Sequence, residues 1–142
     1  MLGRAGSGLY PVRLAGGFVA DLHGVDLRSR NALSLVRERD RFSLHTALEA
    51  ARRRPEPIVA SVEALTEEAS LPLEVLFAPL AGADGSPDRF LGLYQPLATT
   101  GRLRGLPVRE LAIRAIVSAG PANEEVPVPR LKLATLDGRL IA

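Results

Sequence analysis

The stretch that decides the fold is LEVLFAPLAGADGSPDRFLGLYQPL, residues 73–97, in which two apolar runs flank a polar turn. The connection AGADGSPD is short and rich in residues that favour turns. The side chains of the first run alternate with the two-residue period of a β-strand. We therefore predict an antiparallel hairpin with strands over residues 73–80 and 89–97. The alternating apolar residues of its first strand are Leu73, Val75 and Phe77.

Two further segments are predicted to be strands. The run IVASVEAL, residues 58–65, is rich in β-branched residues, and the short link TEEASLP favours a second hairpin over a crossover helix. The run VRELAIRAIVSAG, residues 108–120, fits both a strand and a helix, because its apolar residues satisfy both spacings. We expect a strand there.

The chain ahead of these strands is predicted to contain a short strand, short helices and one longer helix. LYPVRLA, residues 9–15, is expected to form a short strand, and the following segment a helical turn that stops at Gly24. The clearest helix is DRFSLHTALEAARRR, residues 40–54, with Asp40 as its N-cap and Pro55 after its end. Together these elements predict an α+β domain.

The length and composition indicate one domain. At 142 residues and 46% hydrophobic content, the chain is long enough to bury a single core. We assign residues 1–120 to this domain and residues 121–142 to a C-terminal tail, because the segment from residue 121 opens with spaced prolines. The tail is expected to complete the sheet or to mediate dimerisation.

The composition also excludes several kinds of function. Because the chain has no cysteine, it has no disulfide framework, no thiolate nucleophile and no Cys-ligated zinc site. We find no signal peptide and no apolar run long enough for a membrane span, so we expect a cytoplasmic protein without membrane contacts. The net charge is +2 and the pI about 9.7 because nearly all the bases are arginines. Nucleic-acid binding through this arginine-rich surface is therefore an alternative function, but not the one we prefer.

No residue pattern predicts catalysis or metal binding. His23 has no serine or cysteine at a spacing that predicts a nucleophilic pair, and we interpret it as a surface or turn residue. The glycine pairs lack the spacing of a dinucleotide or phosphate loop. We interpret four acids as the solvated side of the hairpins. Glu74 is expected to face away from the apolar side and to pair with Arg89 or another arginine across the hairpin. These acids are Glu63, Glu67, Glu68 and Glu74. We therefore expect no enzyme, no metal and no cofactor.

The order of the elements resembles that of a PAS domain. The chain is most similar to a family of compact bacterial PAS-like domains, first catalogued as a domain of unknown function. The resemblance rests on five motifs that occur in order across residues 9–117: RLAG (13–16), the G-x-x-L of Gly24 to Leu27, DR (40–41), LEVLFAPL and RFLGLYQPL. It implies a PAS-like antiparallel sheet with short helices packed on one face. It also implies a non-enzymatic sensory or protein-interaction module.

Three positions differ from what the resemblance implies. The family has more chain ahead of the RLAG motif, including a first strand, so we expect a gap in the sheet that residues 130–136 (RLKLATL) or a second subunit fills. Leu103 stands where a tryptophan is expected, which predicts looser packing of that loop. His45 lies on the helix that supplies the iron ligand in haem PAS domains, but it is three residues ahead of Leu48 rather than four, which argues against that role.

The resemblance further implies a small apolar cavity between the helices and the sheet, which holds a small apolar ligand or is simply a filled core. The residues expected to line it are Phe18, Leu22, Leu44, Leu48, Phe77, Leu91 and Tyr94. Both faces of the strands are apolar, because Leu76 and Leu80 alternate with the inward residues of the same strand. We therefore expect a homodimer, and a signalling protein of unknown identity as a further partner.

Overall fold

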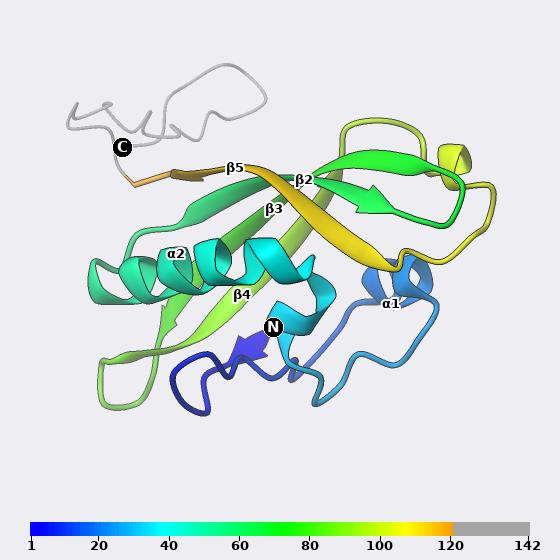
Figure 1. Cartoon of the computed structure of the whole chain (residues 1–142). Helices are drawn as coiled ribbons and strands as arrows, with labels where there is room; N and C mark the ends of the chain where they lie inside the picture. Colours follow the sequence, from blue (N-terminus) through cyan, green and yellow to red (C-terminus); the bar gives the residue numbers. More distant parts are fainter. Residues whose placement is uncertain (121–142) are drawn as a thin grey trace, which may run out of the picture.

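The computed structural model describes residues 1–120, which form a five-stranded sheet with helices packed against one face (Figure 1). All strand pairs are antiparallel, and the strand order is β1-β4-β3-β2-β5. The α+β class predicted from the sequence is confirmed. The strands are β1 (Leu2–Gly3), β2 (Ile58–Leu65), β3 (Ser70–Ala81), β4 (Pro87–Pro96) and β5 (Glu110–Ser118). The predicted tail, residues 121–142, lies outside the described residues.

The central hairpin is the one predicted from residues 73–97. Strands β3 and β4 pair in a register that places Val75 opposite Tyr94 and Phe77 opposite Gly92. In the turn between them, Asp84 accepts hydrogen bonds from the backbone and hydroxyl of Ser86, and Gly85 adopts a positive φ of 78°. The short turn fixes the register of the strands, and with it the face on which each side chain lies.

The ambiguous segment 108–120 contains strand β5, as expected. It pairs with β2, so the sheet ends at β5. A register shift at Ser61/Val62 marks a bulge in this ladder. Leu111 is buried in the core because its cross-strand partner Ala64 faces the helices. Pairing with β2 thus decides between the two patterns that the sequence allows.

The helices cover the inner face of the sheet (Figure 1). The longest helix contributes Leu44, Leu48 and Ala51 to the core. Gly24, with φ of 64°, ends the first helix as predicted. The helices are α1 (Gly17–His23) and α2 (Arg41–Arg53), with three short 3₁₀ turns η1 (Ala32–Leu35), η2 (Glu38–Asp40) and η3 (Thr100–Leu103).

One local prediction is wrong, and another is only partly confirmed. Residues 9–15 form isolated bridges rather than a strand, because their backbone bonds are divided between the short strand β1, where Val12 bridges to Leu2, and an irregular loop around Asn31. Asp40 occupies the N-cap position of α2, as predicted, but its side chain makes no capping bond. Its own backbone is already helical, in η2, so the carboxylate is turned away and accepts a hydrogen bond from the Ile113 amide, 3.0 Å away. Asp40 therefore joins the start of α2 to β5.

The expected gap at the sheet edge is partly filled by the chain itself. Leu2 and Gly3 form β1 and pair with Phe90 and Arg89 of β4, so the prediction that the first strand is missing is wrong. Residues 130–136, which were expected to fill this gap, lie outside the described residues. Leu103 is buried in the core, and the loop that carries it borders a surface hollow, so the looser packing of this loop stays a prediction.

Candidate functional site

A small apolar cavity lies between the helical layer and the sheet. Its volume is about 80 Å³, and its walls include Val36 and Leu44 from the helical side and Phe77, Gly92 and Tyr94 from the sheet. A water molecule occupies about 30 Å³ in the liquid, whereas pockets for organic ligands usually have about 300 Å³ or more. The cavity therefore has room for only a few atoms unless side chains move.

Four of the seven predicted lining residues are buried and Tyr94 is partly buried, but only three of these five line this cavity. Leu44, Phe77 and Tyr94 form part of its wall. Leu48 is fully buried in the core without contributing to the wall. Leu22 is buried on α1, where it borders a separate surface hollow formed with the η3 loop. Whether any of these residues binds a ligand stays a prediction.

The two remaining residues, Phe18 and Leu91, lie away from the cavity. Leu91 is 50% exposed on the outer face of the sheet. A strand places residues three apart on opposite faces, so Leu91 and Tyr94 cannot both face inward. Phe18 is 44% exposed and borders the same hollow as Leu22, because α1 packs its other side on the core. Gly92, which also lines the cavity, was not predicted, although a glycine inside a strand often marks a site where a ligand or another backbone approaches closely.

A buried histidine and a partly buried tyrosine form a polar contact beside the cavity. His23 is only 4% exposed, so its interpretation as a surface residue is wrong. Its Nε2 atom lies 3.4 Å from the Tyr94 hydroxyl. Burial lowers the pKa of His23 and raises the pKa of Tyr94, so both side chains are neutral near pH 7. This pair gives the otherwise apolar cavity one polar neighbour.

Filling the cavity is expected to stabilise the protein. In Gly92→Ala the added methyl group points toward the inner face, where its nearest neighbour beyond the adjacent residues is the Leu76 carbonyl oxygen at 3.9 Å. We expect the free energy of unfolding to rise by about 0.5–1 kcal/mol, from lower chain entropy in the unfolded state and better packing. Urea denaturation measures this change. Gly101→Ala, in the exposed η3 turn, is the control, and a loss of stability in Gly92→Ala would show that the cavity is already filled.

A second polar site surrounds the carboxylate of Glu49 on α2. Its Oε1 atom accepts hydrogen bonds from the Tyr10 hydroxyl at 2.6 Å and from Arg4 Nε at 2.8 Å. Its Oε2 atom accepts one from Arg52 Nη2 at 3.1 Å. Desolvation on burial raises the pKa of Glu49, but the hydrogen bonds from these donors lower it by more, to about 2. The carboxylate therefore fastens the N-terminal segment to α2.

His45 lies next to this carboxylate site. Its Nδ1 atom is 3.3 Å from the Tyr10 hydroxyl and its Nε2 atom is 3.5 Å from the Ser7 hydroxyl. Both ring nitrogens thus face protein hydroxyl groups, and His45 is not part of the cavity wall. Within residues 1–120, no three His, Asp or Glu side chains are grouped as metal ligands.

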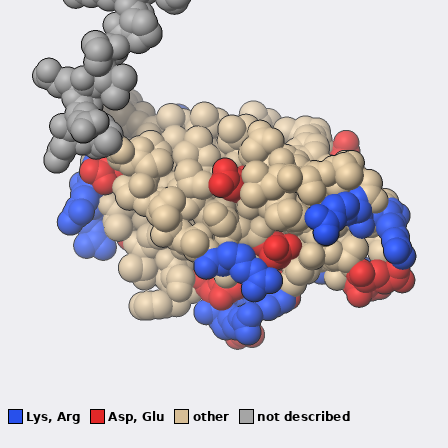
Figure 2. Space-filling view, turned by 90° about the horizontal axis from the view of Figure 1, so that it is seen from above, with Lys and Arg blue, Asp and Glu red and all other residues tan. Residues whose placement is uncertain are grey.

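The outer face of the sheet is apolar and uncovered by the described residues. Cross-strand register aligns one row over four strands, with Leu93 56% exposed at one end. The row consists of Val117, Val59, Leu76 and Leu93. Figure 2 shows this face as largely uncharged, with most charged side chains gathered at its rim. We call this surface the outer face.

The charged residues of the outer face lie on either side of this row. Glu63 is four residues beyond Val59 on β2. Glu74 of β3 pairs with Ser61, so it lies halfway between Val59 and Glu63 along the strand direction. Arg89 is four residues before Leu93 on β4, at the other end of the strands. Glu74 faces outward as predicted, but its cross-strand neighbours are Ser61 and Gln95, so the expected pairing with Arg89 is wrong.

Many of the described arginines are paired with acids rather than gathered on one face. Within residues 1–120, ion pairs of 2.9 Å join Arg28 to Asp26, Arg37 to Glu110 and Arg109 to Glu67. Figure 2 likewise shows blue and red side chains next to one another at the rim. In the same part of the chain, no helix is long and apolar enough to cross a membrane.

The sheet, the helices on its inner face and the cavity between them define a PAS-like module. The chain belongs to the PAS domain family: the family's sequence model matches residues 1–95 of the 142, which confirms the resemblance seen in the sequence motifs. The match covers β1 to most of β4, and β5 follows it along the chain. No curated protein and no solved structure matches the chain.

Proposed function

We propose that this PAS domain is a non-enzymatic protein-interaction module that forms a homodimer through the outer face. The observation that supports this most is the row formed by Val117, Val59, Leu76 and Leu93, which leaves a continuous apolar surface across four strands. A sheet that is apolar on both sides needs cover on both sides, and the described helices cover only one.

Charge complementarity favours a second copy as the partner. Glu63 and Arg89 lie about 13 Å from the apolar row on opposite sides of it, at about 3.3 Å per residue. We place the two-fold axis of the dimer along this row, which runs across the strands. The outer faces of the two copies then face each other, and the strands of the second copy run in the reverse direction. This end-for-end arrangement brings Arg89 of that copy to the level of Glu63, two residues beyond the level of Glu74. The same surface is thus complementary to itself, as a two-fold interface requires.

The volume of the cavity limits the size of any ligand that the domain senses. An occupant of about 80 Å³ is a ligand of a few atoms, and a nucleotide or a haem does not fit in that volume. We therefore place the interaction role ahead of ligand sensing. The nucleic-acid alternative gains no support, because the ion pairs described above already engage several arginines.

An exchange of charges tests the end-for-end dimer. We expect Arg89→Glu and Glu63→Arg each to weaken dimerisation about tenfold, because each places like charges at the same level of the interface. The double variant restores the opposite pairing and is expected to recover most of the lost affinity. Sedimentation velocity over a concentration series measures the dissociation constants.

The matched control is Arg28→Glu, which changes an exposed arginine outside the outer face by the same charge. It is expected to leave the dissociation constant unchanged. If the two single variants dimerise like the wild type, or if the double variant is weaker than either, the end-for-end arrangement is wrong.

A further inference from the structure

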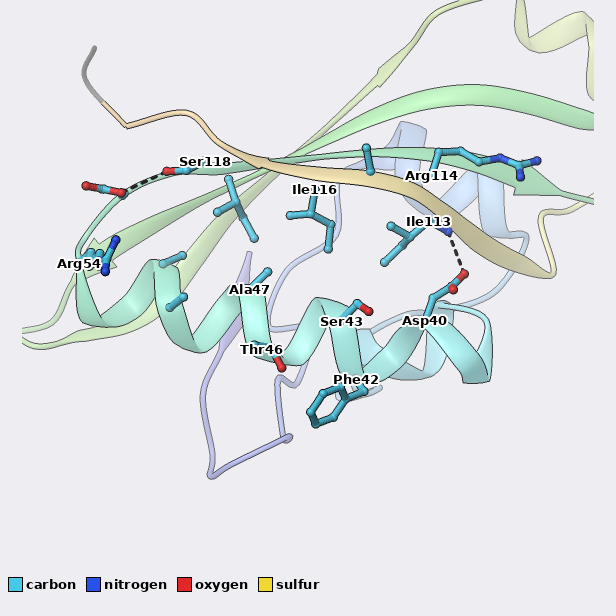
Figure 3. Close-up of a pocket in the computed structure, with 15 residues that line it drawn as sticks. Asp40, Phe42, Ser43, Thr46, Ala47, Arg54, Ile113, Arg114, Ile116 and Ser118 are labelled. Carbon is cyan, nitrogen blue, oxygen red and sulfur yellow. Dashed lines mark hydrogen bonds between the residues drawn. The ribbon is translucent and has the colours of Figure 1, made fainter. Parts of the chain in front are cut away.

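A second apolar surface lies between helix α2 and the edge strand β5 (Figure 3). It is an open groove of about 650 Å³. Figure 3 shows Ile113 and Ile116 pointing from β5 toward α2, where Ala47 faces them. Polar groups close its two ends: the contact between Asp40 and the Ile113 amide at one end, and the Ser118–Glu56 hydrogen bond near Arg54 at the other.

Strand β5 has an open edge beside this groove. Its first half is already closed, because the Leu111 carbonyl accepts a hydrogen bond from the Arg37 amide and the Ile113 amide donates to Asp40. The inward Ala119 amide, which donates to the Pro57 carbonyl, fixes the direction of the amides before it, since successive amides of an antiparallel strand point to alternate sides. Ile116 and Ser118 therefore direct their amides outward. The outward Ile113 amide agrees with this, because the bulge in the β2–β5 ladder shifts the alternation by one residue between Ile113 and Ile116.

Among residues 1–120, no backbone group pairs with the outward side of β5 beyond Ile113. An unpaired edge next to an apolar groove is the arrangement that accepts an extended segment as an added strand. Backbone hydrogen bonds to the edge hold such a segment, and every second side chain enters the groove. The required sequence is therefore an alternation of apolar residues over about five positions.

We propose that residues 130–136, RLKLATL, bind in this groove as a sixth strand, antiparallel to β5. Leu131 and Leu133 alternate with the charged Arg130 and Lys132, as the groove requires. The eleven connecting residues 119–129 reach up to about 36 Å, enough to reverse direction from the end of β5. In this direction the segment begins beside Glu56, which places the positive Arg130 near that carboxylate.

The proposed strand does not depend on the dimer of the outer face. It extends the sheet at β5, whereas the prediction from the sequence placed the same residues at the edge where β1 now lies. In the added strand, Leu131 and Leu133 face α2, while Lys132 and Ala134 face the other side of the sheet. This alternation gives the proposal a matched pair of test positions.

Amide hydrogen exchange of the full chain tests the proposal. We compare the wild type with Leu133→Asp, which places a charge in the groove, and with Ala134→Asp, which makes the same change one residue later on the opposite side. In the wild type and Ala134→Asp, the Ile116 and Ser118 amides are expected to be protected. In Leu133→Asp they are expected to exchange at least about tenfold faster, while the Val62 amide in the middle of the sheet is unchanged.

Three results would overturn the proposal. The first is equal exchange of the Ile116 amide in all three proteins. The second is equal acceleration in both variants, which would show that added charge rather than strand pairing matters. The third is protection that appears only as the protein concentration rises, which would place the segment of another copy in the groove.

Discussion

Replacing Leu93 with aspartate is expected to convert the homodimer into a monomer. Leu93 is more than half exposed on the outer face, and in the proposed dimer it would be buried at one end of the apolar row. Burying an unpaired carboxylate there opposes association, and we expect the dissociation constant to rise at least about 100-fold. Light scattering coupled to size-exclusion chromatography, run across a range of concentrations, measures the change in mass.

The control for this experiment is Phe42→Asp. Phe42 is the most exposed large apolar side chain of the described residues, but it lies on α2, on the opposite side of the sheet from the outer face. The same chemical change there is expected to leave the dimer intact. Monomers in both variants would mean that general surface hydrophobicity drives association, and dimers in both would mean that the outer face is not the interface.

The change Glu49→Gln is expected to lower the free energy of unfolding by about 2 kcal/mol at pH 7, because charged hydrogen bonds to a largely buried carboxylate are replaced by weaker ones. The neutral amide also leaves Arg4 and Arg52 without the negative charge that they share. Urea denaturation measures the loss. Glu68→Gln is the control, since that acid makes only an exposed, 3.9 Å contact to Arg104.

The pH dependence of stability gives an independent check on Glu49. Its pKa is about 2 in the folded protein and near the ordinary value of 4.5 in the unfolded chain. A lowered pKa stabilises the fold fully above the unfolded value, and this contribution disappears as the pH falls from about 4.5 to about 2. The wild type is therefore expected to lose more stability than Glu49→Gln between pH 5 and pH 3. Parallel curves would contradict this role of Glu49.

The sequence was sufficient to predict the central hairpin, because alternation of apolar residues and a short turn are local signals. It also predicted the strand at residues 108–120, but only as the preferred of two patterns. Pairing with β2 decides between them, and a single window of sequence does not contain that information. The missing capping bond at Asp40 has the same origin, since its carboxylate bonds to a strand that lies 73 residues later.

The candidate site was harder to predict than the fold. The cavity residues were chosen for being apolar, and Leu91 was included although strand alternation places it on the face opposite Tyr94. The site around Glu49 was missed altogether. Its donors Arg4 and Tyr10 are 45 and 39 residues away along the chain, and only the fold brings them together.

The alternation of β5 has a thermodynamic consequence. Ile116 faces the groove beside α2, whereas its neighbour Val117 belongs to the row on the outer face. Strand β5 thus contributes side chains to both proposed binding surfaces. If a strand bound in the groove changes the twist of β5, it also changes the shape of the dimer interface. The coupling is then reciprocal: dimerisation alters the affinity of the groove by the same factor by which the groove alters dimerisation.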